Sequence, residues 1–434
     1  MEIIKFPIIP YQLYNCFAES QQFKLRIFIL ILTMKRSTKF LCLFSITILL
    51  YSYPVNAQTE LDDRAVLNFE EGLGFLSPDS LYGVNLRFRM QNRVGMTTVS
   101  STDLQPEGFE ANVRRLRLRF DGFMGQNNFT YYLQLSFSRG DQDWDNTGFP
   151  GIVRDAMVFY NITPKFFLGF GQGKLPGNRQ RLVSSGSLQF ADRSNVNAVF
   201  NIDRDFGITF NYSSDAGQTH YRLRGAISSG EGRNITRTDN GLAYTGRVEI
   251  LPMGRFKSSG DYFEGDILRE PKPKLSFGTG ASYNHKSLRS AGQRGSSLPE
   301  AQNILSYFAD MVAKYNGWAM TLEYALRHIE DQEVFVIDQQ NVYSFTGWGF
   351  NGQLSYVFTN DFEIAGRYTF IEPGNTIKWF ETRQSIYTLG LSKYLRDHRS
   401  KVQLNISLNE NPGQSYLPAG RDFWNIMFQI ETGI

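Results

Sequence analysis

The sequence predicts an all-β protein, a transmembrane antiparallel β-barrel of about 16 strands. Apolar and polar residues alternate with a period of two along most of the chain, as at Val84, Leu86, Phe88 and Met90. Long polar connections take turns with short ones between these segments, which is typical of outer-membrane barrels. Aromatic residues make up 15% of the chain, enough for aromatic girdles at two membrane interfaces. Because a closed sheet pairs its whole backbone, polar residues can fill the inner face although lipid surrounds the outer one.

The amino terminus predicts an export signal. A basic stretch from Lys35 to Lys39 precedes an apolar run from Phe40 to Leu50 and a small-residue triplet that ends at Ala57. A run of 11 residues is too short for a membrane span, which takes about 20. We therefore expect a signal peptide over 34–57, cleaved after Ala57, and an over-extended, mis-annotated start over 1–33.

Removing residues 1–57 changes the composition. Cys16 and Cys42 both lie before the cut, so the mature chain has no cysteine. Of the 45 basic and 42 acidic residues, six and two respectively lie in 1–57, which leaves 39 basic and 40 acidic residues. Global charge therefore argues for neither a nucleic-acid partner nor anion binding. The four histidines are dispersed, and no HExxH or GxSxG motif occurs, so we expect neither a cofactor nor an enzyme.

The strands follow in order after a short periplasmic segment over 58–80, and the barrel domain is expected to cover 81–434. The alternating segments are 81–92, 112–122, 129–138, 153–161, 166–173, 206–212, 219–227, 241–251, 274–284, 305–315, 318–328, 346–358, 362–371, 384–395, 400–408 and 422–430. Asn316-Gly317 predicts a tight hairpin, since both residues tolerate the positive φ of a type I′ turn. The connection 252–273 is the exception, because it is long where a short turn is expected.

Several segments resemble the phosphate-selective porin O and P family of outer-membrane porins, in particular its Bacteroidota branch. They are Asn85–Gln91, Arg114–Gly122, Arg154–Ala156, Gly171–Pro176, Ala191–Ser194, Arg204–Gly207, Gly246–Glu249, Pro252–Gly254, Gly260–Tyr262 and Glu363–Tyr368. The resemblance implies a trimeric porin in the bacterial outer membrane with a long constricting third extracellular loop, here about 174–205. It also implies membrane lipids, lipopolysaccharide and small anions such as phosphate as partners.

Basic residues on the inward side of the strands are the candidate pore-lining and anion-binding residues. By alternation they are Arg87, Arg89, Arg115, Arg117, Arg119, Arg222, Arg224, Arg247, Arg327, Arg367 and Lys401, and Lys174 enters the constricting loop. Arg115, Arg117 and Arg119 have no acidic partner in their own strand and form the best anion track. Arg114 has outward parity and is expected to snorkel to the headgroups.

Two alternatives stay open at this point. Glu249, Glu323 and Glu363 share the inward side with the arginines, so ion pairs could simply keep a water-filled wall hydrated. The function expected is a porin for passive diffusion of small hydrophilic solutes, with anions favoured. The competing interpretation is a barrel without a channel that acts as a surface binding or structural protein through its long loops.

Overall fold

The computed structural model describes residues 66–68, 72–125, 128–141, 151–235, 241–337, 339–411 and 420–434. The expected signal peptide and its cleavage site lie outside the described residues. Side chains are described from residue 72 onward.

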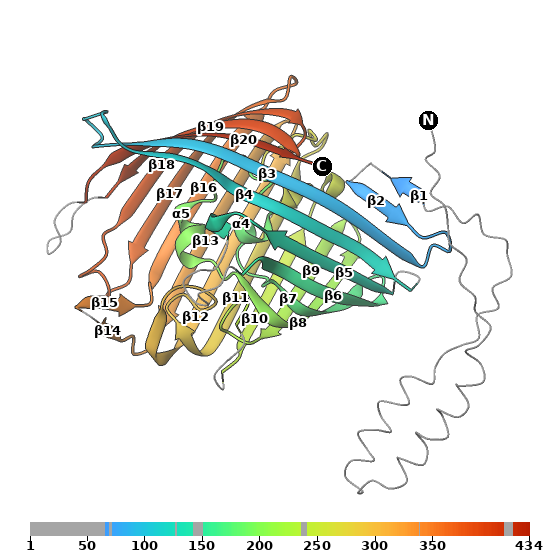
Figure 1. Cartoon of the computed structure of the whole chain (residues 1–434), viewed down its shortest axis with the longest axis horizontal. Helices are drawn as coiled ribbons and strands as arrows, with labels where there is room; N and C mark the ends of the chain where they lie inside the picture. The colour runs from blue at the N-terminus through green and yellow to red at the C-terminus, as the bar shows by residue number, and fades with distance from the viewer. Residues whose placement is uncertain are drawn as a thin grey trace, which may run out of the picture. The chain divides into compact units, whose positions relative to one another are not determined.

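Sixteen antiparallel strands close into a barrel, as predicted (Figure 1). They are β3 (Tyr82–Thr98), β4 (Pro106–Met124), β5 (Phe129–Ser136), β6 (Val153–Thr163), β7 (Phe166–Lys174), β8 (Arg204–Ala216), β9 (Thr219–Ser228), β10 (Ala243–Leu251), β11 (Lys274–Arg289), β12 (Ser297–Tyr315), β13 (Trp318–Ile329), β16 (Gly347–Val357), β17 (Phe362–Pro373), β18 (Gln384–Arg396), β19 (Ser400–Glu410) and β20 (Phe423–Gly433). The last strand pairs with the first, with Phe428 opposite Val94, so the sheet has no free edge between them.

Two short strands continue the sheet beyond the carboxyl end of β20. Strand β2 (Leu73–Leu76) pairs with the beginning of β3, and β1 (Val66–Asn68) pairs with β2. Because β20 reaches only as far as Arg89 on β3, β2 covers the backbone of β3 that β20 leaves open.

The outer face of the barrel is apolar. Phe170 is 58% exposed and packs edge-on against Phe206 of the next strand, with 5.3 Å between ring centroids. At the end with the short turns, Trp318 and Phe358 both pack against Tyr356, each with 4.9 Å between centroids. Such rows of exposed rings are typical of the aromatic girdle at a membrane interface. Among the residues that the structure describes, no helix is long and apolar enough to cross a bilayer.

The connections alternate between long and short as expected, and 252–273 is again the exception. Asn316 and Gly317 both have positive φ, 45° and 92°, and join β12 to β13 as the predicted hairpin. The connection after β13 was expected to be a long polar one, and it contains a two-stranded hairpin, β14 (Val334–Ile337) and β15 (Gln340–Tyr343). The short strands escaped the sequence analysis because each contains only four residues.

Within the described parts of the connections lie four short helices: η1 (Arg139–Asp141), α4 (Arg179–Leu182), α5 (Asn195–Phe200) and η2 (Lys257–Tyr262). Ser194 caps α5 by accepting a hydrogen bond from the Asn197 backbone N–H. Figure 1 shows α4 and α5 within the ring of strands rather than at its rim. The connections that carry α4, α5 and η2 therefore shape the interior.

Candidate functional site

The segment between β7 and β8, residues 175–203, folds into the barrel and is called the inner loop. It is the segment for which a constricting loop was expected. Its Leu175, Val196 and Phe200 belong to a buried cluster with Phe308 of β12 and Ile371 of β17. Burial of a large apolar side chain contributes about 1.5–3 kcal/mol, so this cluster holds the inner loop against one side of the barrel wall.

Buried polar contacts fix the inner loop to the same wall. Arg179 Nε lies 2.9 Å from Asp310 Oδ1, and the Gln180 backbone N–H donates to Glu323 at 2.7 Å. Lys401 Nζ donates to the Leu188 carbonyl oxygen at 2.6 Å. Loss of one partner would leave the other buried and unpaired, so these contacts keep the inner loop in one position.

The long connection between β10 and β11, residues 252–273, also folds inward and is called the inner turn. The guanidinium groups of Arg179 and Arg224 lie over the ring of Tyr262, at 5.0 and 5.1 Å from its centroid. Glu264 accepts hydrogen bonds from the side chain of Gln180 and from the backbone N–H of Gln189. A short turn was expected here. The inner turn is longer, and its additional residues support the inner loop.

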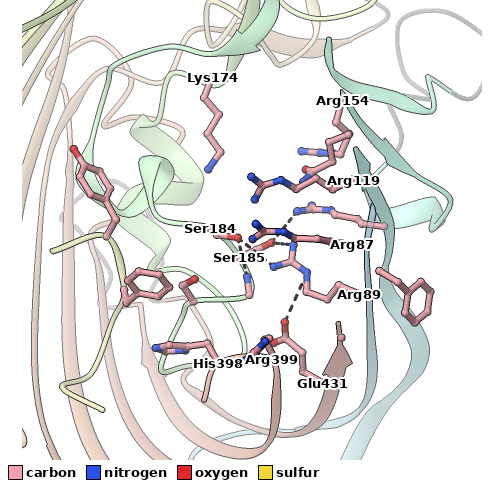
Figure 2. Close-up of a pocket in the computed structure, with 18 of the residues that line it drawn as sticks. Arg87, Arg89, Arg119, Arg154, Lys174, Ser184, Ser185, His398, Arg399 and Glu431 are labelled. Atoms are coloured by element: carbon pink, nitrogen blue, oxygen red, sulfur yellow. Dashed lines mark hydrogen bonds and ion pairs between the residues drawn. The ribbon is translucent and has the colours of Figure 1, made fainter. Parts of the chain in front are cut away.

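The inner loop also bonds to β3 and β4, since Arg89 and Arg117 donate to the Ser185 hydroxyl at 2.9 and 2.8 Å. Beside these contacts, cavities remain between the two segments and the wall that β3 to β8 form, and they are together called the passage. A first cavity of about 480 Å³ lies towards the end with the short turns (Figure 2). Among the described residues, one acidic side chain, that of Glu431, lines it together with ten basic ones. The basic residues are Arg87, Arg89, Arg117, Arg119, Arg154, Lys174, Arg181, Arg193, Arg204 and Arg399.

A second cavity of about 700 Å³ lies towards the end with the long loops. The two cavities share Arg117, Arg154, Arg181 and Arg193 in their linings. Arg117 and Arg154 come from β4 and β6, whereas Arg181 and Arg193 come from the inner loop. Both sides of the connecting stretch are therefore basic.

Several carboxylates offset part of this positive charge. Asp203 pairs with Arg181 and Arg204, Asp155 with Arg204, and Asp121 with Arg119. Asp141 in η1 accepts from Arg117 Nε at 2.6 Å, and its backbone carbonyl oxygen accepts from Arg154 at 2.5 Å. Asp192 in the inner loop lies 2.7 Å from Arg93 and 3.4 Å from Arg115. The carboxylates of Asp141 and Asp192 are each shared between at least two arginines, and the basic side chains around the two cavities outnumber the carboxylates.

Arg193 is a cation of the passage whose side chain donates to neutral acceptors. Its guanidinium donates to the carbonyl oxygens of Gln180 and Val183, both at 2.7 Å, and these acceptors are neutral. Burial lowers the pKa of Arg193 well below its usual value, and the nearby charge of Arg181 lowers it further. A guanidinium stays protonated in proteins, so Arg193 is a buried charge that no carboxylate among the described residues pairs with.

The structure distributes the twelve candidate residues over three roles. Those that line the first or second cavity are Arg87, Arg89, Arg115, Arg117, Arg119, Lys174 and Arg367. Arg224 lines a pocket beside the first cavity. Those that instead hold the inner loop, the inner turn or their neighbours are Arg222, Arg247, Arg327 and Lys401. Whether the first group binds anions stays a prediction.

Two expectations about single arginines are wrong. Arg119 does have an acidic partner in its own strand, because Asp121 lies two residues further on the same face, at 2.7 Å. Arg114 does not reach the headgroups, since it donates to the Gly140 carbonyl oxygen and lies 3.8 Å from Asp192. A bulge in the pairing of β3 with β4 skips Arg114 and changes the face to which its side chain belongs.

The alternative, in which Glu249, Glu323 and Glu363 pair with arginines, holds for Glu249 alone. Arg247 lies 2.8 Å from Glu249. Glu323 instead accepts from the Gln180 backbone, and Glu363 accepts from the Tyr394 hydroxyl at 2.5 Å. Ion pairing along one strand therefore does not account for the whole lumen.

Sequence reasoning missed several basic residues of the passage. Arg93 continues the inward side of β3 and was lost because the predicted strand ended at residue 92. Arg154 lies at a bulge in the pairing of β5 with β6, which breaks the alternation. Arg181 and Arg193 lie in the inner loop, where no periodicity exists that could have revealed them.

The comparisons with known proteins agree with this architecture. The model of the family described as phosphate-selective porin O and P matches residues 84–416. No curated protein matches the sequence. Among solved structures, OprB of Pseudomonas putida has a TM-score of 0.52 at 8% identity and covers 81% of this chain and 94% of its own.

Two further porin structures are similar in fold. Salmonella typhi OmpF in complex with daunomycin has a TM-score of 0.50 at 12% identity, and 81% of this chain and 98% of that chain are covered. A loop-deletion mutant of OmpT from Vibrio cholerae has a TM-score of 0.50 at 10% identity, with 82% and 100% covered. At such low identity these structures bear on the fold alone, whereas the family match covers most of the chain. The chain therefore belongs to the phosphate-selective porin O and P family and is a porin of the bacterial outer membrane.

Proposed function

We propose that this porin prefers small anions, phosphate among them, and lets them cross the outer membrane by passive diffusion. The observation that carries the proposal is the stretch shared by the two cavities, where arginines face the passage from both sides. Arg presents fixed, planar and always-charged donors, which can replace part of the hydration shell of an anion. A cation entering the same stretch meets repulsion from both sides.

The arginines on β4 form successive sites along the passage. Arg115, Arg117 and Arg119 lie two residues apart on one face, which corresponds to about 7 Å between neighbours. Asp192, Asp141 and Asp121 weaken the three sites because each competes with the anion for a guanidinium group of this row. Conduction requires sites that are favourable enough to enter and weak enough to leave, and this arrangement meets both requirements.

Reconstitution in planar bilayers tests the proposal. In a gradient of potassium chloride, the sign of the reversal potential should report anion preference. The triple substitution of Arg115, Arg117 and Arg119 by Gln should move it towards the cation side. Arg255→Gln provides the control, since that side chain is 59% exposed on the inner turn and pairs with Asp215 outside the passage. Cation preference of the unaltered porin would overturn the proposal.

Phosphate and the assembly need separate measurements. Phosphate added to a chloride solution should reduce the chloride current, because both ions use the same arginines. We also propose that three copies form a homotrimer in contact with membrane lipids and lipopolysaccharide, as membership of the family suggests. Chemical cross-linking in detergent and in membranes should then give products of up to three chains and no larger ones.

A further inference from the structure

A third cavity of about 490 Å³, called the side pocket, opens beside the first cavity. Both linings contain Tyr132, Lys174 and Leu182, so the two spaces adjoin. The side pocket is built mainly on β5 to β9. Its wall residues lie near the short turns, since Phe159 is close to the end of β6 and Phe167 close to the beginning of β7.

The wall of the side pocket is unusual for the interior of a porin because it is apolar. Met157, Phe159 and Phe167 belong to the inward side of β6 and β7, opposite the exposed Val158 and Phe170. Phe159 and Phe167 pack edge-to-face, with 5.8 Å between their centroids. Neither ring belongs to the buried cluster that holds the inner loop. Both rings are only partly buried, so a ligand that covers their remaining exposed area would gain apolar burial.

Glycines on the inward side of β7 provide the room for this wall. A methyl group at Gly169 would lie 2.8 Å from the ring of Phe159, and one at Gly173 would lie 2.8 Å from Met157 Cγ. Both approaches are shorter than real contacts of a Cβ atom. Glycine at these two positions therefore allows Met157 and Phe159 to lie flat along the wall.

Polar groups stand at the edge of the same pocket. Lys174 Nζ donates to the carbonyl oxygen of Leu182 at 2.9 Å, and Arg224 lies over the ring of Tyr262. The hydroxyl of Thr209 is buried and has no hydrogen-bond partner among the described residues. Asp155 is held by Arg204 in two hydrogen bonds of 2.9 and 3.0 Å, so its charge is compensated.

We infer that the side pocket binds the apolar ring of an organic anion whose acidic group lies among the basic residues of the first cavity. The class is an aryl phosphate or aryl carboxylate, because the pocket supplies two rings, a thioether and cations at its edge. Its volume falls in the range of small-molecule sites, roughly 300–1,000 Å³. This inference rests on the proposed anion preference and deepens it by naming a class of solute.

Block of the chloride current by two phosphate esters isolates the contribution of the ring. Phenyl phosphate and methyl phosphate share the acidic group and differ in the apolar part. We expect phenyl phosphate to halve the current of the unaltered porin at a concentration about tenfold lower than methyl phosphate. Addition from the side of the short turns should act at lower concentration than addition from the other side.

Substitutions on β6 and β7 connect this difference to the side pocket. In the double variant Phe159→Thr and Phe167→Thr, the two esters should block the chloride current at equal concentrations. The chloride current without esters should remain. Phe170→Thr is the matched control, since it makes the same change on the outer face of β7 and should keep the difference. Phe167→Leu, which keeps an apolar side chain without the ring, should reduce the difference if the double variant does not assemble.

The outcomes separate this inference from the proposed function. Equal block by both esters in the unaltered porin, or a difference that survives in Phe167→Leu and in the double variant, would overturn the side pocket as a binding site. Cation preference in the salt gradient together with a persistent advantage of phenyl phosphate would overturn the anion preference alone.

Discussion

At the scale of single residues, Arg193 is the strongest test of the passage because its side chain donates to carbonyl oxygens rather than to a carboxylate. The interaction energy of a unit charge with an ion 4 Å away is about 1 kcal/mol in a water-like dielectric. Arg193→Gln should therefore lower the anion-to-cation permeability ratio roughly fivefold, measured as a reversal potential in a salt gradient. Arg255→Gln, exposed on the inner turn, should leave the ratio unchanged. An unaltered ratio in Arg193→Gln would mean that ions do not pass this side chain.

The acidic residue beside that passage predicts how selectivity depends on pH. Burial alone would raise the pKa of Asp192, but the positive charges of Arg115 and Arg93 outweigh burial and hold its pKa well below the usual value. A carboxylate with a depressed folded-state pKa contributes its full stabilisation above its unfolded value of about 3.9 and loses it as the pH falls towards the folded value. Asp192 should thus stay ionised at pH 4.5.

We therefore expect the reversal potential to be the same at pH 8 and pH 4.5. Asp192→Asn should raise the anion preference already at pH 7, because it removes the charge that Arg93 and Arg115 share. If the anion preference of the unaltered porin rises between pH 7 and pH 5, protonation of a carboxylate in that range controls the passage and the expectation for Asp192 is wrong.

At the scale of elements, the strands could be predicted and the interior could not. All sixteen strands were expected, because each must present one face to lipid and one to water. Apolar and polar residues therefore alternate along each strand with a period of two. The inner loop does not lie between lipid and water, so its sequence has no such alternation. Arg181 and Arg193 reach the passage through two short helices and contacts with distant strands, so no local pattern contains their positions. The same applies to the bulge at Arg114, which depends on the partner strand.

Glycines on the wall determine how closely the inner loop can pack. A methyl group at Gly390 of β18 would lie 2.7 Å from the ring of Phe190 in the inner loop. Gly390→Val should therefore displace the inner loop, change the single-channel conductance and lower the free energy of unfolding by about 1–3 kcal/mol. Conductance and the denaturant midpoint measure the two effects.

Gly366 of the neighbouring strand β17 offers the matched control. A Cβ atom there would have no heavy atom within 4 Å among the described residues, so Gly366→Val should leave the conductance unchanged. If both variants behave like the unaltered porin, the inner loop is not held where Phe190 touches β18.

At the scale of the whole molecule, the two faces of the barrel should contact different solvents. Trp318 and Trp379 are almost equally exposed, at 52% and 54%, but Trp318 lies on the outer face of β13 and Trp379 in the connection between β17 and β18. In variants that keep one of the five tryptophans, brominated lipids should quench the fluorescence of Trp318 and spare Trp379. Aqueous iodide should do the reverse.

Equal exposure makes this comparison decisive, because accessible area alone predicts equal quenching by any one agent. Only a surrounding bilayer can separate the two tryptophans, since the hydrocarbon covers the strands and not their connections. The packing of Trp318 against Tyr356 places it within the aromatic girdle, where the ring meets both acyl chains and headgroups. Bromines attached near the headgroups should thus quench Trp318 more strongly than bromines at the acyl ends. Quenching of Trp318 by iodide and not by brominated lipid would mean that water covers the outer face, and the membrane-spanning barrel would have to be abandoned.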